Sequence, residues 1–335
     1  MHCSLTAAAL FGFLASAAVA EAAPLTQVGS IPLGDAKGAI GTLTIDYANQ
    51  RLFVLEPAAG TLAVLDLSGG KLAQSVTGLK DPRGLARAPT DNRLYVSTGD
   101  GKLKIYAGTP LRAEKDLDIG ANPGPLYYDA GSERIYMGYG GRKIAIIDST
   151  RNKHWENIRL DAAPGPLALE DQGSRIFIAA AGEPRILVAD RDGNKQTGSW
   201  RTSGSDAAAA IGLDEDGARL LAAFRQPAEL AWLDLNDGAL KGHAAACAEP
   251  GQILSDGSRR RAYLTCGDGR IKVFERDSSG GLCRYRLGRD GQGSGCRCAR
   301  AHQRTALSRR PRRRRPRGGD PHLRPGGLIP SANLH

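Results

Sequence analysis

One phrase of sequence recurs about every 42 residues, and this period constrains the fold more than any other feature. In most copies an acidic residue and a four-residue turn precede an arginine, and the arginine opens a stretch of apolar and aromatic residues. Successive arginines stand 41 to 44 residues apart. A fixed period of this length is typical of folds that repeat one small structural unit. The six arginines, here called the anchor arginines, are Arg51, Arg93, Arg134, Arg175, Arg219 and Arg261.

Short strands fill each repeat. A further apolar stretch follows the anchor after 10 or 11 residues, as at Leu62–Asp66 and Ile144–Asp148, and a proline- and glycine-rich segment precedes most anchors, as at Pro164–Leu167. These stretches alternate, contain many β-branched and aromatic residues and are bounded by turn residues, so they predict strands. Four strands fit each period and no helical pattern intervenes, which indicates the blades of a β-propeller. The sequence therefore predicts an all-β propeller of four-stranded blades over residues 25–280, with six recognisable blades.

Two copies of the repeat resemble a known family. Both copies are similar to the YVTN-type repeat of exported bacterial seven-bladed β-propellers. The first copy comprises Arg93–Thr98 and Gly101–Tyr106, and the second comprises Arg134–Tyr136 and Ile144–Asp148. The resemblance covers roughly residues 25–276, whereas the Gly-His and Trp-Asp pairs of WD40 propellers are missing. The resemblance implies a ring of seven blades and export from the cytoplasm.

The acidic residue of each turn and the anchor arginine that follows it, such as Asp46 and Arg51, have a simple interpretation. The two side chains are predicted to close a hairpin through an exposed ion pair. An exposed pair stabilises a protein by less than about 1 kcal/mol, so no ligand role is assigned to these residues.

The positive charge of the chain is confined to its C-terminal segment. Residues 281–335 hold 14 arginines, no lysine and two aspartates, while residues 1–280 carry a net charge of −2. The charge therefore excludes the body of the protein as a nucleic-acid binder. A basic arm for nucleic acid or anionic lipid is one interpretation of the segment, which contains the run Arg309–Arg317.

A shift of reading frame is the other interpretation, because arginine-, proline- and glycine-rich sequence without lysine is what GC-rich DNA encodes out of frame. When Ala306–Pro311 is written in suitable codons and read one base later, it becomes Leu-Tyr-Leu-Ala-Val-Pro. Gly319–Pro325 becomes Ala-Ile-Arg-Ile-Tyr-Ala-Pro in the same frame. We therefore predict that residues 281–335 are an out-of-frame, disordered tail, and that a frameshift has removed the seventh blade.

The frameshift hypothesis has structural consequences. In the intact parent, a strand at Leu25–Ile31 would join the last blade and close the ring. In the present chain, blade six is predicted to expose an open edge, and the apolar faces of the two end blades are predicted to lie bare.

The N-terminus predicts export. Ala7–Ala20 is an apolar run of signal-peptide length, and Ala18–Ala20 ends it with a small-x-small cleavage site. The alternative is a buried N-terminal helix. We predict a signal peptide at residues 1–20, a periplasmic or secreted protein, and no transmembrane segment.

Two cysteines of the predicted propeller form an even pair. Cys3 lies in the predicted signal peptide, and three more cysteines lie beyond residue 280, which leaves Cys247 and Cys266. In an oxidising compartment we predict a disulfide between them, with two buried free thiols as the alternative.

Polar residues are predicted to gather at one mouth of the propeller channel, where the loops that enter each blade meet the hairpins after the anchor strands. Acidic and amide oxygens at Asp81, Asn122 and Glu249 suit a hard cation such as calcium, as in propeller lactonases that the chain resembles. Turns are also rich in Asp and Asn for local reasons, so no metal ligand and no cofactor is assigned. The predicted ligand-binding residues of this mouth are Asp81, Arg83, Asn122, Arg142 and Glu249.

Catalytic motifs are missing from the body. It holds only His154 and His243, without a supporting nucleophile or haem-attachment motif, so no catalytic residue is assigned. The sequence favours a non-enzymatic, exported scaffold that binds a protein, a peptide or a small ligand at one face. The alternative is a metal-dependent lactone or ester hydrolase that uses the acidic residues of the channel mouth. A nucleic-acid-binding protein would depend wholly on the tail.

Overall fold

The computed structural model describes residues 25–34, 38–202, 206–277 and 280–284. The predicted signal peptide at residues 1–20 lies outside the described residues. So do the predicted seventh-blade segment and the predicted out-of-frame tail, apart from residues 281–284.

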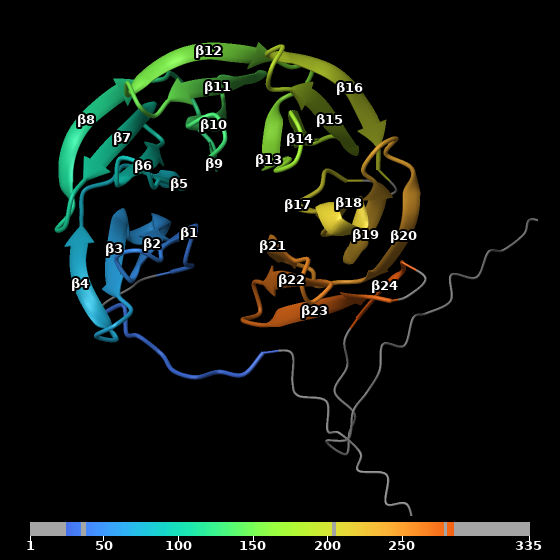
Figure 1. The fold of residues 1–335 in the computed structure, drawn as a ribbon, viewed down its shortest axis with the longest axis horizontal. Coiled ribbons are helices and arrows are strands. Elements are labelled where there is room, and N and C mark those ends of the chain that lie inside the picture. The colour runs from blue at the N-terminus through green and yellow to red at the C-terminus, as the bar shows by residue number, and fades with distance from the viewer. Residues whose placement is uncertain (1–24, 35–37, 203–205, 278–279, 285–335) are drawn as a thin grey trace, which may run out of the picture. The chain divides into compact units, whose positions relative to one another are not determined.

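Six four-stranded antiparallel sheets are arranged as the blades of a β-propeller (Figure 1). Each blade contains four consecutive strands, with the first innermost and the fourth outermost. Blades 1 to 3 contain β1 Leu43–Asp46, β2 Arg51–Glu56, β3 Thr61–Asp66, β4 Lys71–Val76; β5 Pro82–Ala88, β6 Arg93–Thr98, β7 Lys102–Ala107, β8 Arg112–Asp118; β9 Leu126–Asp129, β10 Arg134–Tyr139, β11 Lys143–Asp148 and β12 Lys153–Arg159. Blades 4 to 6 contain β13 Pro164–Leu169, β14 Arg175–Ala180, β15 Arg185–Asp190, β16 Lys195–Arg201; β17 Ala210–Asp214, β18 Arg219–Phe224, β19 Glu229–Asp234, β20 Leu240–Ala245; β21 Pro250–Asp256, β22 Arg261–Cys266, β23 Ile271–Arg276 and β24 Leu282–Arg284. Two short 3-10 helices, η1 Pro57–Ala59 and η2 Glu215–Gly217, are the only helices of the described residues.

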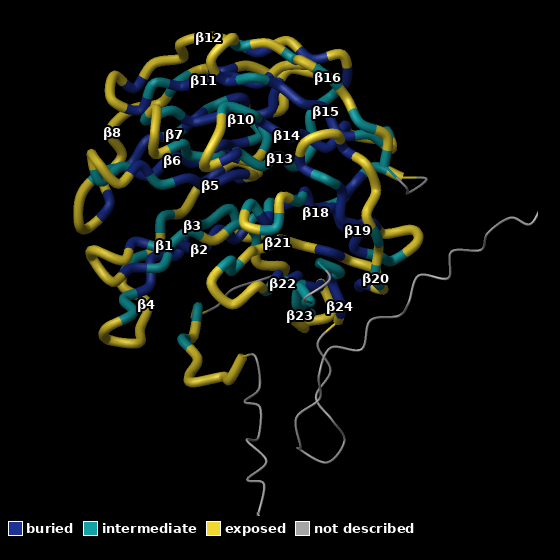
Figure 2. Tube along the Cα trace, turned by 45° about the vertical axis from the view of Figure 1, so that its right-hand side comes forward, coloured by how far each residue is buried: buried dark blue, intermediate teal, exposed yellow. Residues whose placement is uncertain are grey.

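The structure confirms the predicted fold class. Each anchor arginine is the first residue of the second strand of its blade. In blades 1 to 5 the second and third strands are largely buried on both faces, which explains why they read as nearly continuous apolar stretches. The fourth strands are largely exposed and polar, as the outer rim of the ring shows (Figure 2).

The hydrophobic core is divided into clusters that lie between neighbouring blades. Between blades 3 and 4, for example, Tyr136 of β10 packs in one cluster with Ile176 and Ile178 of β14. Similar clusters join each consecutive pair from blade 1 to blade 6. Each blade therefore covers the apolar face of its neighbour, which is the driving force that the repeat predicts.

The face of blade 1 that points away from blade 2 is not bare. Val54, Ala63 and Leu65 form a small cluster there, and Ile31 and Leu33 of the N-terminal segment pack against it. Their relative exposures of 2%, 2% and 3% contradict the prediction of a bare face at this end. Residues 25–33 form no strand in the structure, so they cover the face as an irregular segment.

Blade 6 differs in part from the prediction. β24 pairs with β23 and Leu282 enters the core, so the sixth sheet has four strands and β23 is not an open edge as predicted. The predicted bare face is present, because Leu254 and Ile271 are 57% and 52% exposed on the face that points away from blade 5. The ring is open between this blade and blade 1 (Figure 1).

The two ends of the propeller carry different connections. At the turn end, the first strand of each blade turns into the second and the third into the fourth. At the connector end, the second strand turns into the third, and a connector joins the fourth strand to the first strand of the next blade.

Polar contacts at the turn end join neighbouring blades. Asp46 of blade 1 is fully buried and pairs with its own anchor Arg51 at 2.7 Å and with Arg87 of blade 2 at 2.9 Å. The interpretation of this pair as an exposed hairpin closure is therefore wrong, because the second blade covers it. The other junctions use Tyr95 with Asn152 at 2.6 Å, Asp129 with Arg191 at 2.6 Å, Arg175 with the Leu235 carbonyl at 2.6 Å, and Asp214 with Arg276 at 3.2 Å.

Among the residues that the structure describes, no helix has the length and apolar character needed to cross a bilayer.

Candidate functional site

The five residues predicted to bind a ligand all lie at the connector end. Asp81 and Glu249 directly precede β5 and β21, Arg83 lies within β5, Asn122 lies in the connector before β9, and Arg142 lies in the hairpin before β11. All five are exposed. Their predicted role in ligand binding stays a prediction.

The structure brings only two of these residues together. Arg83 pairs with Asp81 at 2.6 Å, and the two side chains are 38% and 59% exposed. No hydrogen bond or ion pair of the described residues joins Asp81, Asn122 and Glu249 to one another. Within the same ranges, no group of three or more His, Cys, Asp or Glu side chains is placed to hold a metal ion.

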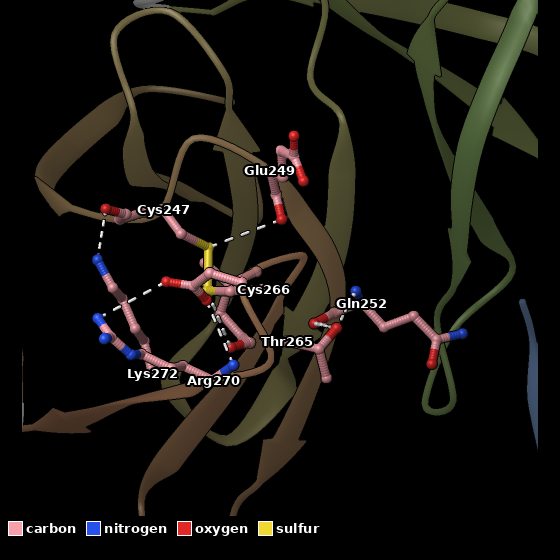
Figure 3. The surroundings of a disulfide bond; sticks show 10 residues. Cys247, Glu249, Gln252, Thr265, Cys266, Arg270 and Lys272 are labelled. Carbon is pink, nitrogen blue, oxygen red and sulfur yellow. Dashed lines mark hydrogen bonds and ion pairs between the residues drawn. A yellow bond between two sulfur atoms is a disulfide. The ribbon is translucent and has the colours of Figure 1, made fainter. Parts of the chain in front are cut away.

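A disulfide lies at the connector end of blade 6 (Figure 3). Cys247 of the connector is bonded to Cys266, the last residue of β22, with a Cα–Cα distance of 6.1 Å. Lys272 of β23 donates a hydrogen bond to the carbonyl of Ala246 at 2.5 Å, and burial lowers the pKa of this lysine. The predicted pairing of Cys247 with Cys266 is confirmed, and the alternative of two free thiols is excluded.

Replacing both Cys247 and Cys266 with serine should lower the free energy of unfolding by about 3 kcal/mol. The cysteines are 19 residues apart, so the bond restricts the unfolded chain and ties the connector to the second strand of the blade. Equilibrium unfolding in urea measures the loss. The slope of free energy against urea should also rise, because the released unfolded chain exposes more surface. Equal stability of the two proteins would contradict the prediction.

A hollow of about 460 Å³ lies at the opposite, turn end of the channel. Its walls come mainly from the first strands of blades 4 to 6, β13, β17 and β21, and from the turns that follow them, and Tyr127 of β9 in blade 3 completes the lining. These strands line the inner side of the ring (Figure 1). We call this feature the turn-end hollow.

The walls of the turn-end hollow combine polar groups with apolar residues from neighbouring blades. They include Leu167 and Leu169 of β13, Ile211 and Leu213 of β17, and Ile253 of β21. β17 and β21 approach closely at Gly212, where a Cβ atom would lie 2.8 Å from Cγ2 of Ile253. Glycine at this position therefore sets the spacing of two walls.

The rim of the turn-end hollow is acidic. Asp171 from blade 4 and Asp216 from blade 5 are exposed, and neither carboxylate has a hydrogen bond or ion pair among the described residues. Glu215 lies between them and accepts hydrogen bonds from the backbone N–H groups of Asp171 at 2.6 Å and Gln172 at 3.1 Å. This contact crosses the junction between two blades and holds the turn that contains Asp171 against η2, which contains Asp216.

The remaining polar residues suit binding. Asp214 is buried and already paired with Arg276, and the lining adds Gln172, Ser255 and the half-buried Tyr127. No histidine, lysine, arginine or cysteine lines the hollow. Ser255 therefore has no imidazole or amine base beside it, and the residues present can supply hydrogen bonds, negative charge and apolar contact.

Sequence reasoning missed the turn-end hollow, because it assigned every turn acid to hairpin closure. The sequence did contain a signal at Asp214–Asp216, where three consecutive acidic residues occupy one turn. The other repeats have one or two acidic residues in the corresponding turn before the anchor arginine. A second hollow of about 510 Å³ lies on the outer rim between the end of β12 and β16. It is shallow and lies away from the channel.

Comparison of the chain with protein-family models gives no match, and comparison with curated proteins gives none either.

Proposed function

We propose that this protein is an exported, non-enzymatic binding scaffold of the YVTN type, and that it binds its ligand in the turn-end hollow. The observation that carries the proposal is the hollow itself, an open recess lined by apolar and polar groups of neighbouring blades. The core clusters between those blades fix its walls relative to one another. A ligand therefore binds with little loss of conformational entropy in the protein.

Two further observations support the proposal. The disulfide of blade 6 is typical of proteins that fold in an oxidising compartment, which supports a periplasmic or secreted location. The six regularly spaced anchor arginines, each opening a second strand, support the YVTN-type assignment.

The calcium dependence of the protein distinguishes the scaffold from a metal-dependent hydrolase. A hydrolase at the connector end would use oxygens of Asp81, Asn122 and Glu249, and a bound cation would stabilise the folded state. For a scaffold we expect the same melting temperature in calcium chloride and in EDTA. We also expect no hydrolysis of a γ-lactone or a p-nitrophenyl ester above the buffer rate.

The variants Asp81→Asn and Glu249→Gln complete this test. Under the proposal they melt like the unmodified protein in both solutions. A calcium-induced rise of the melting temperature that both variants abolish, together with lactone or ester hydrolysis, would overturn the proposal in favour of the hydrolase.

A further inference from the structure

We infer that the turn-end hollow selects an extended peptide that carries a lysine or arginine next to an aliphatic side chain; this inference rests on the proposed function. The rim and walls include four carboxylates, from Asp171, Asp214, Glu215 and Asp216, and no cationic side chain. Neighbouring residues already satisfy two of the four, because Asp214 pairs with Arg276 and Glu215 accepts two backbone hydrogen bonds. Within the described ranges, the carboxylates left without a hydrogen-bond or ion-pair partner are those of Asp171 and Asp216.

These two carboxylates define the position of a cation. Asp171 belongs to the turn after β13 and Asp216 to η2 of the next blade, and the hydrogen bonds of Glu215 hold the two turns together. The negative charge of both carboxylates would attract a cation bound at either of them, whereas a phosphate or carboxylate ligand would be repelled. The rim therefore excludes nucleic acids and anionic lipids as occupants.

The walls beneath the rim define the rest of the ligand. The half-buried Leu169 and Leu213 and the exposed Leu254 offer aliphatic surface, whereas Leu167, Ile211 and Ile253 are buried in the core behind them. An apolar side chain adjacent to the cation would bury its surface there, and the methylene stem of lysine or arginine would do the same.

The shape of the hollow favours a peptide over a small amine. The hollow is open and extends across the first strands of three blades, so an extended chain has room to leave it at both ends. Gln172 and Ser255 are exposed at its edge and can donate to or accept from the backbone of such a chain.

The test uses the full-length protein and three synthetic probes. The first is the pentapeptide Ac-Ala-Ile-Lys-Ile-Ala-NH2, the second replaces its lysine with norleucine, and the third is n-butylammonium. Isothermal titration calorimetry measures the affinities. We expect the lysine peptide to bind roughly three- to tenfold more tightly than the norleucine peptide, and to lose most of this advantage in 0.5 M sodium chloride.

The double variant Asp171→Asn/Asp216→Asn should bind the lysine and norleucine peptides equally, with an unchanged melting temperature. The control Asp192→Asn removes an exposed carboxylate of blade 4 at the same end, outside the lining of the hollow, and should bind like the unmodified protein. Equal binding of the two peptides, an unaffected double variant, or butylammonium binding as tightly as the lysine peptide would each overturn the inference.

The arginine-rich segment of this chain is a competing occupant that the same titration detects. If the lysine peptide binds only to a full-length variant whose arginines between residues 309 and 317 are replaced with glutamine, the chain itself fills the hollow and the inference is wrong. If neither peptide binds to any of these proteins, the inference fails, while the calcium experiment still decides the proposed function independently.

Discussion

A chain whose reading frame is restored near Leu282 should melt roughly 5–20 °C higher than the present chain. One more repeat of about 42 residues contributes roughly 2–6 kcal/mol at the usual stability per residue. The reason is ring closure: a seventh blade would cover the exposed Leu254 and Ile271 of blade 6 and would also pack on the outer face of blade 1. A terminal repeat of an open array contacts one neighbour, whereas a repeat that closes a ring contacts two.

Differential scanning calorimetry of the two proteins measures the rise. The control replaces residues 285–335 with a glycine- and serine-rich segment of equal length, which removes the arginines without supplying strands. This control should melt like the present chain. Equal melting of the restored and present chains would contradict the prediction, and a confirmed gene sequence without a skipped or added base would remove the frameshift hypothesis itself.

Replacing Asp46 with alanine should destabilise the protein by about 3–5 kcal/mol. Its carboxylate is 0% exposed and pairs with Arg51 and Arg87, whose side chains are 7% and 12% exposed. The variant would leave two largely buried guanidinium groups without a counter-charge at the junction of blades 1 and 2. Urea denaturation measures the loss, and Asp91→Ala is the control.

Asp91 makes the comparable contact in an exposed position. It pairs with the anchor Arg93 at 2.8 Å, with side chains that are 36% and 21% exposed, so its loss should cost less than about 1 kcal/mol. Similar losses for the two variants would show that burial of the Asp46 contact contributes nothing.

The effect of Asp46 should also depend on pH. Burial raises the pKa of this carboxyl, but hydrogen bonds from Arg51 and Asn49 and the charge of Arg87 outweigh burial and lower it below 3.8. A carboxyl with a lowered pKa in the folded state stabilises the protein above its unfolded pKa and loses this effect as the pH falls. The difference between the unmodified protein and the alanine variant should therefore be full above pH 3.8 and should shrink below it.

The sequence predicted the blades well because the repeat, the alternation and the turns all indicate the same unit. Arg134 and Arg175 each follow the turn that ends a first strand and begin the apolar second strand. The period of the repeat therefore places both residues. The disulfide followed from composition, since Cys247 and Cys266 were the even pair of the body.

The candidate site could not be predicted in the same way. The repeat shows that Glu170 directly follows a first strand and that Asp214 ends one, but it does not show which turns meet across a blade junction. The hydrogen bonds that Glu215 accepts from the turn of the preceding blade depend on the spacing of β13 and β17, which packing sets. The burial of Asp46 was missed for the same reason, because the covering Arg87 belongs to another repeat.

The packing of Ile31 and Leu33 on blade 1 has a consequence for assembly of the ring. The surface they occupy is the one that a seventh blade would need, and two occupants cannot share it. Closure would therefore require Ile31 and Leu33 to leave blade 1 first, so the strength of their packing would limit how fast a complete ring forms.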